Sequence, residues 1–205
     1  MDNSNFLQKA NDLIKKGEKI QKGSFFGNLT YGKADRNDDA KDLFVQAANC
    51  YLLGSDHENA VACYERCIAC ETSEEDRAPH YRDAAKCLKD VDTDRYVSYV
   101  KKAIDVYSMS GRASTSAGMA KECAGKLEEE KDYDEAIKMY QKAAQLYTMD
   151  NQATSGQTCD LKANELMIIS KNWDQIPKII KVFEKVAKKY LTQSMLKSSA
   201  LDLFF

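Results

Sequence analysis

The sequence predicts an all-α protein, a right-handed superhelical array of tetratricopeptide-like helical hairpins, which is an α-solenoid. Three observations support this fold class. Only 9 Gly and 2 Pro occur among the 205 residues, which leaves little material for the many tight turns of a β-sandwich or barrel. Apolar residues recur at the period of an amphipathic helix over most of the chain. Similar apolar segments also return every 36 to 43 residues, as they do in helical repeat proteins.

The expected helices are marked by stripes of small, aliphatic and aromatic residues at helical spacing. In chain order, these stripes cover residues 40–51, 60–68, 81–88, 96–107, 117–127, 136–147, 161–169 and 176–186. Short polar joints separate them at residues 54–56, 90–94, 110–111, 131–132, 149–152 and 170–172. From about Asp38 onward we therefore expect one helix after another, joined by short turns.

Several of the stripes share one pattern, which identifies the repeat. The segments are AVACYERCIAC, YVSYVKKAIDVY, AIKMYQKAAQLY and IIKVFEKVAKKY. In each of the first three segments a small residue follows two polar residues. This small residue is Cys67, then Ala103, then Ala143, and the two intervals are 36 and 40 residues. Phe183 corresponds to Tyr140 at a distance of 43 residues. This period is slightly longer than a tetratricopeptide unit, and such units stack into a curved array with one concave face.

Both ends of the chain depart from the repeat. Residues 1–22 form one amphipathic helix, and the stretch SFFGNLTYGK that follows exposes apolar side chains between glycines. We therefore expect two parts: residues 1–36 as an N-terminal helix and exposed hydrophobic loop, and residues 37–205 as the helical-hairpin array. The final residues DLFF lie within an apolar pattern rather than in a polar capping repeat. We interpret this end as a truncation.

Composition excludes several classes of function. The net charge of −2 argues against nucleic acid as a partner, since binding to phosphates requires a basic surface. No run approaches 18 apolar residues, and the N-terminus has no apolar core of a secretory signal. The number of cysteines is odd, at seven, and together with the lack of a secretory signal this indicates reduced thiols in a cytoplasmic protein.

No cofactor, metal or catalytic centre is expected. Only two histidines occur, and the chain has no GxSxG, HExxH or glycine-rich phosphate loop, so we do not expect an enzyme. Cys63, Cys67 and Cys70 share one helix face and could form a zinc site with His57 or His80. Structural zinc sites usually combine two close ligand pairs, and this segment supplies one, Cys67 and Cys70. Buried cysteines that pack like small apolar residues explain the same spacing.

The chain resembles the soluble NSF attachment protein (SNAP) family, in its alpha/beta branch. The resemblance is carried, in order along the chain, by SFFG, DDAKDLFVQAANCY, KKAIDVYSMSGR, YDEAIKMYQKAAQLY and SALDLFF. It implies a cytosolic adaptor that coats the four-helix SNARE bundle in vesicle-mediated transport and membrane fusion. Such an adaptor recruits the hexameric AAA ATPase NSF, which disassembles the bundle. The family's C-terminal bundle, which contacts and stimulates the ATPase, has no counterpart here, so we expect this chain to bind SNAREs without activating the ATPase.

The resemblance also implies which residues contact the SNARE bundle. Carried over by segment, three basic positions and one apolar position are retained, namely Lys89, Arg112, Lys162 and Met195. Three further basic positions of the family are occupied by Ser55, Gly118 and Thr158. Lys121 lies one helical turn from Gly118 and is a candidate to compensate for it. Spaced cations of this kind would attract an acidic helical rod to the concave face.

The N-terminal region suits an anionic membrane surface. Residues 1–33 contain six Lys against three acidic residues, and a basic amphipathic helix followed by apolar side chains is typical of interfacial binding. The expected membrane-contact residues are Phe25, Phe26 and Leu29, which the resemblance implies as well. The alternative is that Phe25 and Phe26 pack the first helix onto the array.

Two other functions remain open. A generic tetratricopeptide-like scaffold would bind a peptide or helix of another partner, and it would have no need of a membrane-contacting loop. A divergent SNAP could engage SNAREs without supporting their disassembly.

Overall fold

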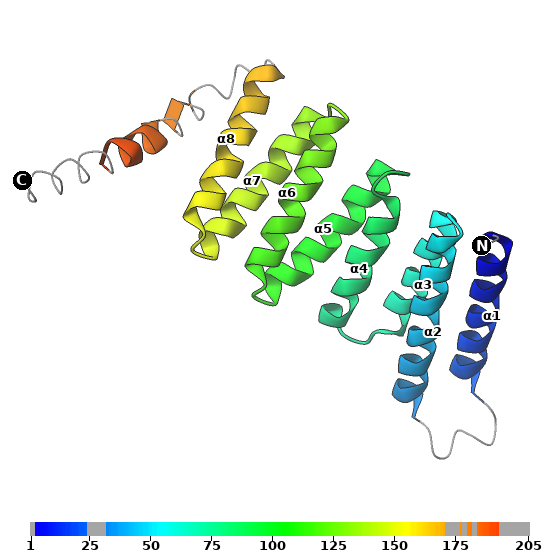
Figure 1. Ribbon diagram of the computed structural model, residues 1–205. Coiled ribbons are helices and arrows are strands. Elements are labelled where there is room, and N and C mark those ends of the chain that lie inside the picture. Colours follow the sequence, from blue (N-terminus) through cyan, green and yellow to red (C-terminus); the bar gives the residue numbers. More distant parts are fainter. Residues whose placement is uncertain (1–2, 24–31, 171–176, 178–179, 182–183, 193–205) are drawn as a thin grey trace, which may run out of the picture. The chain divides into compact units, whose positions relative to one another are not determined.

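The computed structural model describes residues 3–23, 32–170, 177, 180–181 and 184–192, and helices dominate these residues (Figure 1). The bounds are α1 (Asn3–Lys22), α2 (Lys33–Leu53), α3 (His57–Cys70), α4 (Glu74–Leu88), α5 (Thr93–Met109), α6 (Ala113–Glu129), α7 (Tyr133–Met149) and α8 (Ala153–Ile169). Residues 184–192 are helical as well. Every predicted stripe up to residue 169 lies inside one of these helices, whereas the stripe at 176–186 falls partly outside the described residues.

Side chains in the joints determine where several helices begin. Four N-cap residues accept a hydrogen bond from the backbone N–H three residues further on, namely Asp56, Ser73, Asp92 and Asp132. The donor–acceptor distances are 3.0 to 3.2 Å. Each cap satisfies a backbone donor that has no partner within the helix, and this contributes roughly 0.5–2 kcal/mol.

Left-handed residues allow the chain to reverse within short joints. Ser55, Lys131 and Asn151 have φ values of 59°, 64° and 58°, and Gly111 has a φ of 76°. These residues follow α2, α6, α7 and α5 respectively. A left-handed residue ends the helix, so the next helix can pack back against the previous one.

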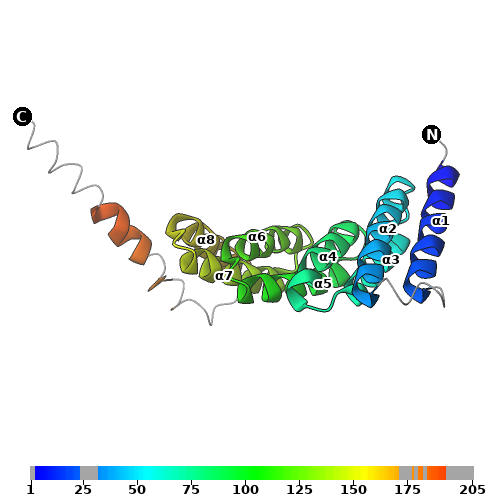
Figure 2. The same cartoon turned by 90° about the horizontal axis from the view of Figure 1, so that it is seen from below.

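The chain divides into two compact units, Met1–Arg112 with α1 to α5 and Ala113–Phe205 with α6 to α8. Within each unit, every helix packs against its neighbours in the sequence, and Figures 1 and 2 show α6, α7 and α8 side by side. Antiparallel neighbours joined by short turns are helical hairpins. The predicted all-α array of helical hairpins, an α-solenoid, is confirmed.

The core of the first unit is tightly packed between α1, α2 and α3. Phe44 is fully buried and lies in one cluster with Cys67 and Cys70, against which Ile14 packs. A Cβ atom built on Gly17 of α1 would lie 2.7 Å from a ring carbon of Phe44, so only glycine fits there. The close approach of α1 and α2 therefore depends on both residues.

Small residues fill the seams of the second unit. The fully or almost fully buried ones are Ala117, Ala120, Cys123, Ala124, Ala136, Ala143, Cys159 and Ala163. Gly156 of α8 approaches the backbone of α7 so closely that an added Cβ would lie 3.0 Å from the carbonyl oxygen of Ala144. Small side chains let the helix axes come close together, and this close packing positions the side chains described next.

Candidate functional site

The predicted SNARE-contact residues of the first unit lie at opposite ends of a helix pair. Lys89 follows α4 directly and is half-buried. Arg112 is exposed beyond the end of α5, where its guanidinium carbon lies 5.5 Å from the centroid of the Tyr107 ring. Because α4 and α5 are antiparallel, the length of α5, about 25 Å at 1.5 Å per residue, separates the two cations. The structure does not bring them together.

Lys162, in the second unit, is engaged by carboxylates of the protein itself. Its Nζ lies 2.8 Å from Oε1 of Glu128 on α6 and 3.2 Å from Oε2 of Glu165 on α8. The hydrogen bond to Glu128, followed by the other contacts with these carboxylates, raises the pKa of Lys162. The side chain is thus a partly exposed cation whose charge is already compensated.

The remaining predicted site residues lie outside the described residues. These are Phe25, Phe26, Leu29 and Met195. The helix that precedes the first three is described, and its lysines Lys15, Lys19 and Lys22 are exposed at a spacing that places them on one face of α1. No helix in the described part of the chain is both long and apolar enough to cross a membrane.

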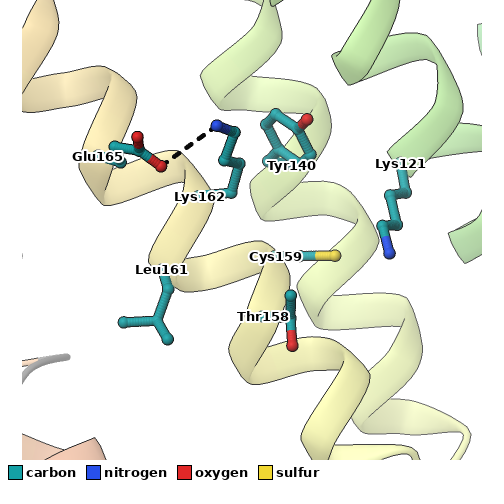
Figure 3. Close-up of a pocket in the computed structure, with 7 residues that line it drawn as sticks. All are labelled: Lys121, Tyr140, Thr158, Cys159, Leu161, Lys162 and Glu165. Carbon is teal, nitrogen blue, oxygen red and sulfur yellow. Dashed lines mark hydrogen bonds and ion pairs between the residues drawn. The ribbon is translucent and has the colours of Figure 1, made fainter.

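A groove between α6 and α8 brings one predicted cation together with the proposed substitute for another. Its volume is about 400 Å³, and Figure 3 shows the side chains around it. The lining residues are Lys121, Tyr140, Thr158, Cys159, Leu161, Lys162 and Glu165. Lys121 comes from α6, Tyr140 from α7 and the others from α8. Two lysines from different helices therefore share one groove.

Tyr140 and Lys162, which both line the groove, contact the same carboxylate. Its ring is buried, and its hydroxyl donates a hydrogen bond of 3.0 Å to Oε2 of Glu128. Burial, together with this hydrogen bond, raises the pKa of Tyr140 to about 12. Glu128 therefore accepts from Tyr140 with one oxygen and from Lys162 with the other.

The two ends of the groove differ in charge. Lys162 and Glu165 lie on the Tyr140 side, whereas Lys121 extends from α6 toward Cys159 and Thr158 (Figure 3). Lys121 is exposed, and among the described residues its ammonium has no ion-pair partner. The groove thus combines a compensated end with a cationic end.

The cysteines behave as packing residues. All seven are free and buried. Burial raises the pKa of Cys63 to about 11 and that of Cys67 to about 12, which keeps the thiols protonated at neutral pH. Within the described part of the chain, no group of three or more His, Cys, Asp or Glu side chains could hold a metal ion.

Sequence reasoning missed the carboxylates that engage Lys162. Glu165 lies three residues after Lys162, a spacing that predicts an ion pair on a helix. Glu128 belongs to the acidic run 128–130 at the end of α6, and such runs usually reach into solvent. Only the tertiary arrangement, in which α7 packs against both α6 and α8, places this residue next to Lys162.

Comparison with known proteins identifies relatives along nearly the whole chain. The family model described as "Soluble NSF attachment protein, SNAP" matches residues 8–205. The alpha-soluble NSF attachment protein of Vitis vinifera is 26% identical over 195 residues, covering 93% of this chain and 64% of the relative. That of Homo sapiens is 27% identical over 213 residues, covering 100% and 70%. The vesicular-fusion protein SEC17 of Komagataella phaffii is 28% identical over 206 residues, covering 97% and 69%. This chain therefore spans about two thirds of the length of these relatives.

Proposed function

This chain belongs to the soluble NSF attachment protein family, and we propose that it is an adaptor that binds assembled SNARE complexes and recruits an NSF-type ATPase to them. Its relatives are named NSF attachment proteins and vesicular-fusion proteins, which supports a role in vesicle fusion. The proposed partners are a four-helix SNARE bundle, the ATPase and the membrane surface that carries the SNAREs. The proposed location is the cytoplasm, with peripheral association to membranes.

The groove of the second unit is the observation that carries the SNARE-binding proposal. Lys121 and Lys162 line it from α6 and α8, and Leu161 adds an apolar contact. A helix presents its side chains in rows at i, i+3 and i+4, so a ridge of such side chains can enter a groove between two helices. Positive charge at the groove attracts an acidic helix and favours one register along it.

The binding proposal is tested with a preassembled, fluorescently labelled SNARE four-helix bundle. We expect the anisotropy to rise as this chain is added, and the affinity to fall from low to high salt because ion pairs with an acidic bundle are screened. An unrelated four-helix bundle of similar net charge is the control. Equal binding to both bundles would favour the generic helical-repeat scaffold, and absence of binding to the SNARE bundle would refute the proposal.

Recruitment of the ATPase is tested by co-sedimentation. We expect an NSF-type ATPase, locked with a non-hydrolysable nucleotide, to sediment with bead-bound SNARE bundles only when this chain is present. The same beads without SNARE bundles are the control. An ATPase that stays in the supernatant in the presence of bound chain would contradict this part of the proposal and leave SNARE binding intact.

We also propose that the N-terminal region contacts an anionic membrane. Lys15, Lys19 and Lys22 are exposed near the end of α1, immediately before the segment with Phe25 and Phe26. Each lysine near an anionic surface contributes about 1 kcal/mol, and insertion of apolar side chains adds to this. The two contributions act together with SNARE binding, since the SNAREs are already anchored in the membrane.

Liposome flotation separates the two contributions. We expect Phe25→Ser/Phe26→Ser to reduce flotation with neutral and anionic liposomes, and Lys15→Glu/Lys19→Glu/Lys22→Glu to reduce it with anionic liposomes only.

A lysine triple elsewhere serves as the matched control. Lys138→Glu/Lys181→Glu/Lys188→Glu changes exposed lysines and alters the net charge by the same amount. Equal loss in both lysine triples would show that net charge alone matters. Unchanged flotation of the phenylalanine variant would mean that these side chains pack against the protein instead.

A further inference from the structure

The two lysines of the α6–α8 groove differ in what they offer a partner. The ammonium of Lys162 already faces two carboxylates, at 2.8 Å from Glu128 and 3.2 Å from Glu165. Lys121 is exposed on the other side of the groove, and the described residues supply no carboxylate to it. The same groove therefore contains one lysine that is already ion-paired, Lys162, which we call the occupied cation. It also contains one lysine without an ion-pair partner among the described residues, Lys121, which we call the available cation.

A partner carboxylate gains little at the occupied cation. To reach Lys162 it would either displace Glu128 or Glu165, which exchanges one ion pair for another, or add a third negative charge to the cluster. Displacement of Glu128 would also weaken the acceptor of the Tyr140 hydroxyl, which is now bonded at 3.0 Å. Exchange of one partly exposed ion pair for another yields little net free energy. The electrostatic free energy gained when a partner carboxylate approaches Lys162 is therefore close to zero.

At the available cation, a partner carboxylate forms a new ion pair. The neighbouring side chains are small: Cys159 is buried, and the Thr158 hydroxyl donates to the carbonyl oxygen of Thr154 at 3.0 Å. Because that donor is used, Thr158 adds no hydrogen-bond donor for an anion. The attraction of an acidic group at this end therefore comes from Lys121.

We infer that Lys121, rather than Lys162, is the cation of this groove that selects an acidic side chain on the partner helix. Lys162 is a positioning residue that holds Glu128, and through it the Tyr140 hydroxyl. This inference rests on the proposed function, since the partner is an acidic helix of the SNARE bundle. It also assigns a role to a residue outside the set of basic positions carried over from the family resemblance.

Charge-matched variants test this assignment by anisotropy with the SNARE bundle. Lys121→Gln removes one positive charge from the groove. Lys138→Gln removes one from an exposed lysine of α7 that does not line the groove. Lys162→Gln/Glu165→Gln removes one charge of each sign, so the net charge of the groove stays the same.

The variants are expected to separate clearly. At low salt we expect Lys121→Gln to weaken binding up to about fivefold, as for one exposed ion pair, and to reduce the salt dependence. Lys121→Arg keeps the charge and is expected to bind as the unmodified chain does. Lys138→Gln and Lys162→Gln/Glu165→Gln are expected to change the affinity less than about twofold. Circular dichroism verifies that each variant is folded.

The outcomes distinguish this inference from the proposed function. Binding of the unmodified chain that is insensitive to Lys121→Gln, or equally weakened by Lys138→Gln, would overturn the inference alone. A larger loss in the Lys162→Gln/Glu165→Gln variant would assign the recognition role to Lys162. Failure of the unmodified chain to bind would overturn the proposed function and the inference together.

Discussion

Glu128 on α6 and Lys162 on α8 form an ion pair of 2.8 Å between helices that are not adjacent in the sequence. Tyr140, on the helix between them, donates a hydrogen bond to the same carboxylate at 3.0 Å. One carboxylate thus joins the three successive helices of the second unit. The connection lies beside the groove and holds its compensated end in place.

Removal of the Tyr140 hydroxyl tests this connection. Tyr140→Phe keeps the buried ring and deletes one hydrogen bond to a charged group, so we expect a loss of about 1–2 kcal/mol in the free energy of unfolding. Urea unfolding followed by circular dichroism measures this loss. Tyr147→Phe on the same helix is the control, because the described residues offer its hydroxyl no hydrogen-bond partner. Equal effects of both changes would contradict the role of Glu128.

The same hydroxyl has a characteristic pH dependence. The pKa of Tyr140 is raised from its ordinary value of 10.0 to about 12, first by burial and then by Glu128. A raised pKa means that the neutral hydroxyl stabilises the fold below pH 10, and that this stabilisation is lost as the pH rises toward 12. When the pH is raised and tyrosinate absorbance is followed, the Tyr140→Phe variant should therefore show one fewer tyrosine that ionises near pH 12 than the unmodified chain does. An unchanged titration curve would show that the hydroxyl is solvated.

Gly17 determines how closely α1 approaches α2. In Gly17→Ala the new Cβ would lie 2.7 Å from a ring carbon of the fully buried Phe44, so α1 must shift, which typically costs about 1–3 kcal/mol. Gly118→Ala is the matched control, because its nearest neighbour, the Tyr147 hydroxyl, would be 4.0 Å away. The control is expected to be stabilised by roughly 0.5–1 kcal/mol, as a helix interior prefers Ala. The midpoint of thermal unfolding measures both effects. A shift of this midpoint in the same direction for Gly17→Ala and Gly118→Ala would refute this account.

Asp160 is expected to destabilise the protein at neutral pH. Burial raises its pKa, and the charge of Lys185 only partly opposes this effect. The raised pKa means that the protonated carboxyl is favoured in the folded state. The contribution of Asp160 to stability is therefore greatest below the ordinary value of 3.8 and declines as the carboxyl ionises. Asp160→Asn removes the ionised form, and we expect a gain of up to about 1 kcal/mol at pH 7 that vanishes in acid.

Exposed Asp105→Asn is the control for this pH dependence. Asp105 lies in the first unit and is exposed on α5, so we expect its replacement to change the free energy of unfolding by no more than about 0.5 kcal/mol. Urea midpoints at neutral and acidic pH provide the comparison. A loss of stability in Asp160→Asn at pH 7 would mean that the attraction to Lys185 outweighs burial.

The buried thiols are expected to react slowly. Burial raises the pKa of Cys63 and of Cys87 to about 11, and the thiolate is the reactive form. At pH 8 a thiol reagent should label the folded chain slowly, whereas all seven cysteines should react in denaturant. Stability due to burial of the neutral thiols should decrease as the pH rises from 9 toward 11. Fast labelling of the folded chain, or zinc retained after dialysis, would contradict the packing role.

Much of the fold could be predicted from local pattern. The stripes at residues 96–107 and 136–147 lie inside α5 and α7, because a helix buries one face and therefore repeats its apolar residues at a fixed period. The joint at 110–111 could be recognised from Gly111, which adopts a φ of 76°. The site was less predictable: Lys162 was identified as a cation, but its ion pair with Glu128 depends on a helix far away in the sequence.

The sequence by itself determined the helices, the repeat and the family, because periodicity, small seam residues and ordered motifs are properties of neighbouring positions. Only the tertiary structure decided that Lys121 and Lys162 line one groove, and that Glu128 and Glu165 already compensate Lys162. The physical reason is that an ion pair depends on the distance between charges in space. A residue's availability to a partner is therefore set by the carboxylates that packing brings beside it.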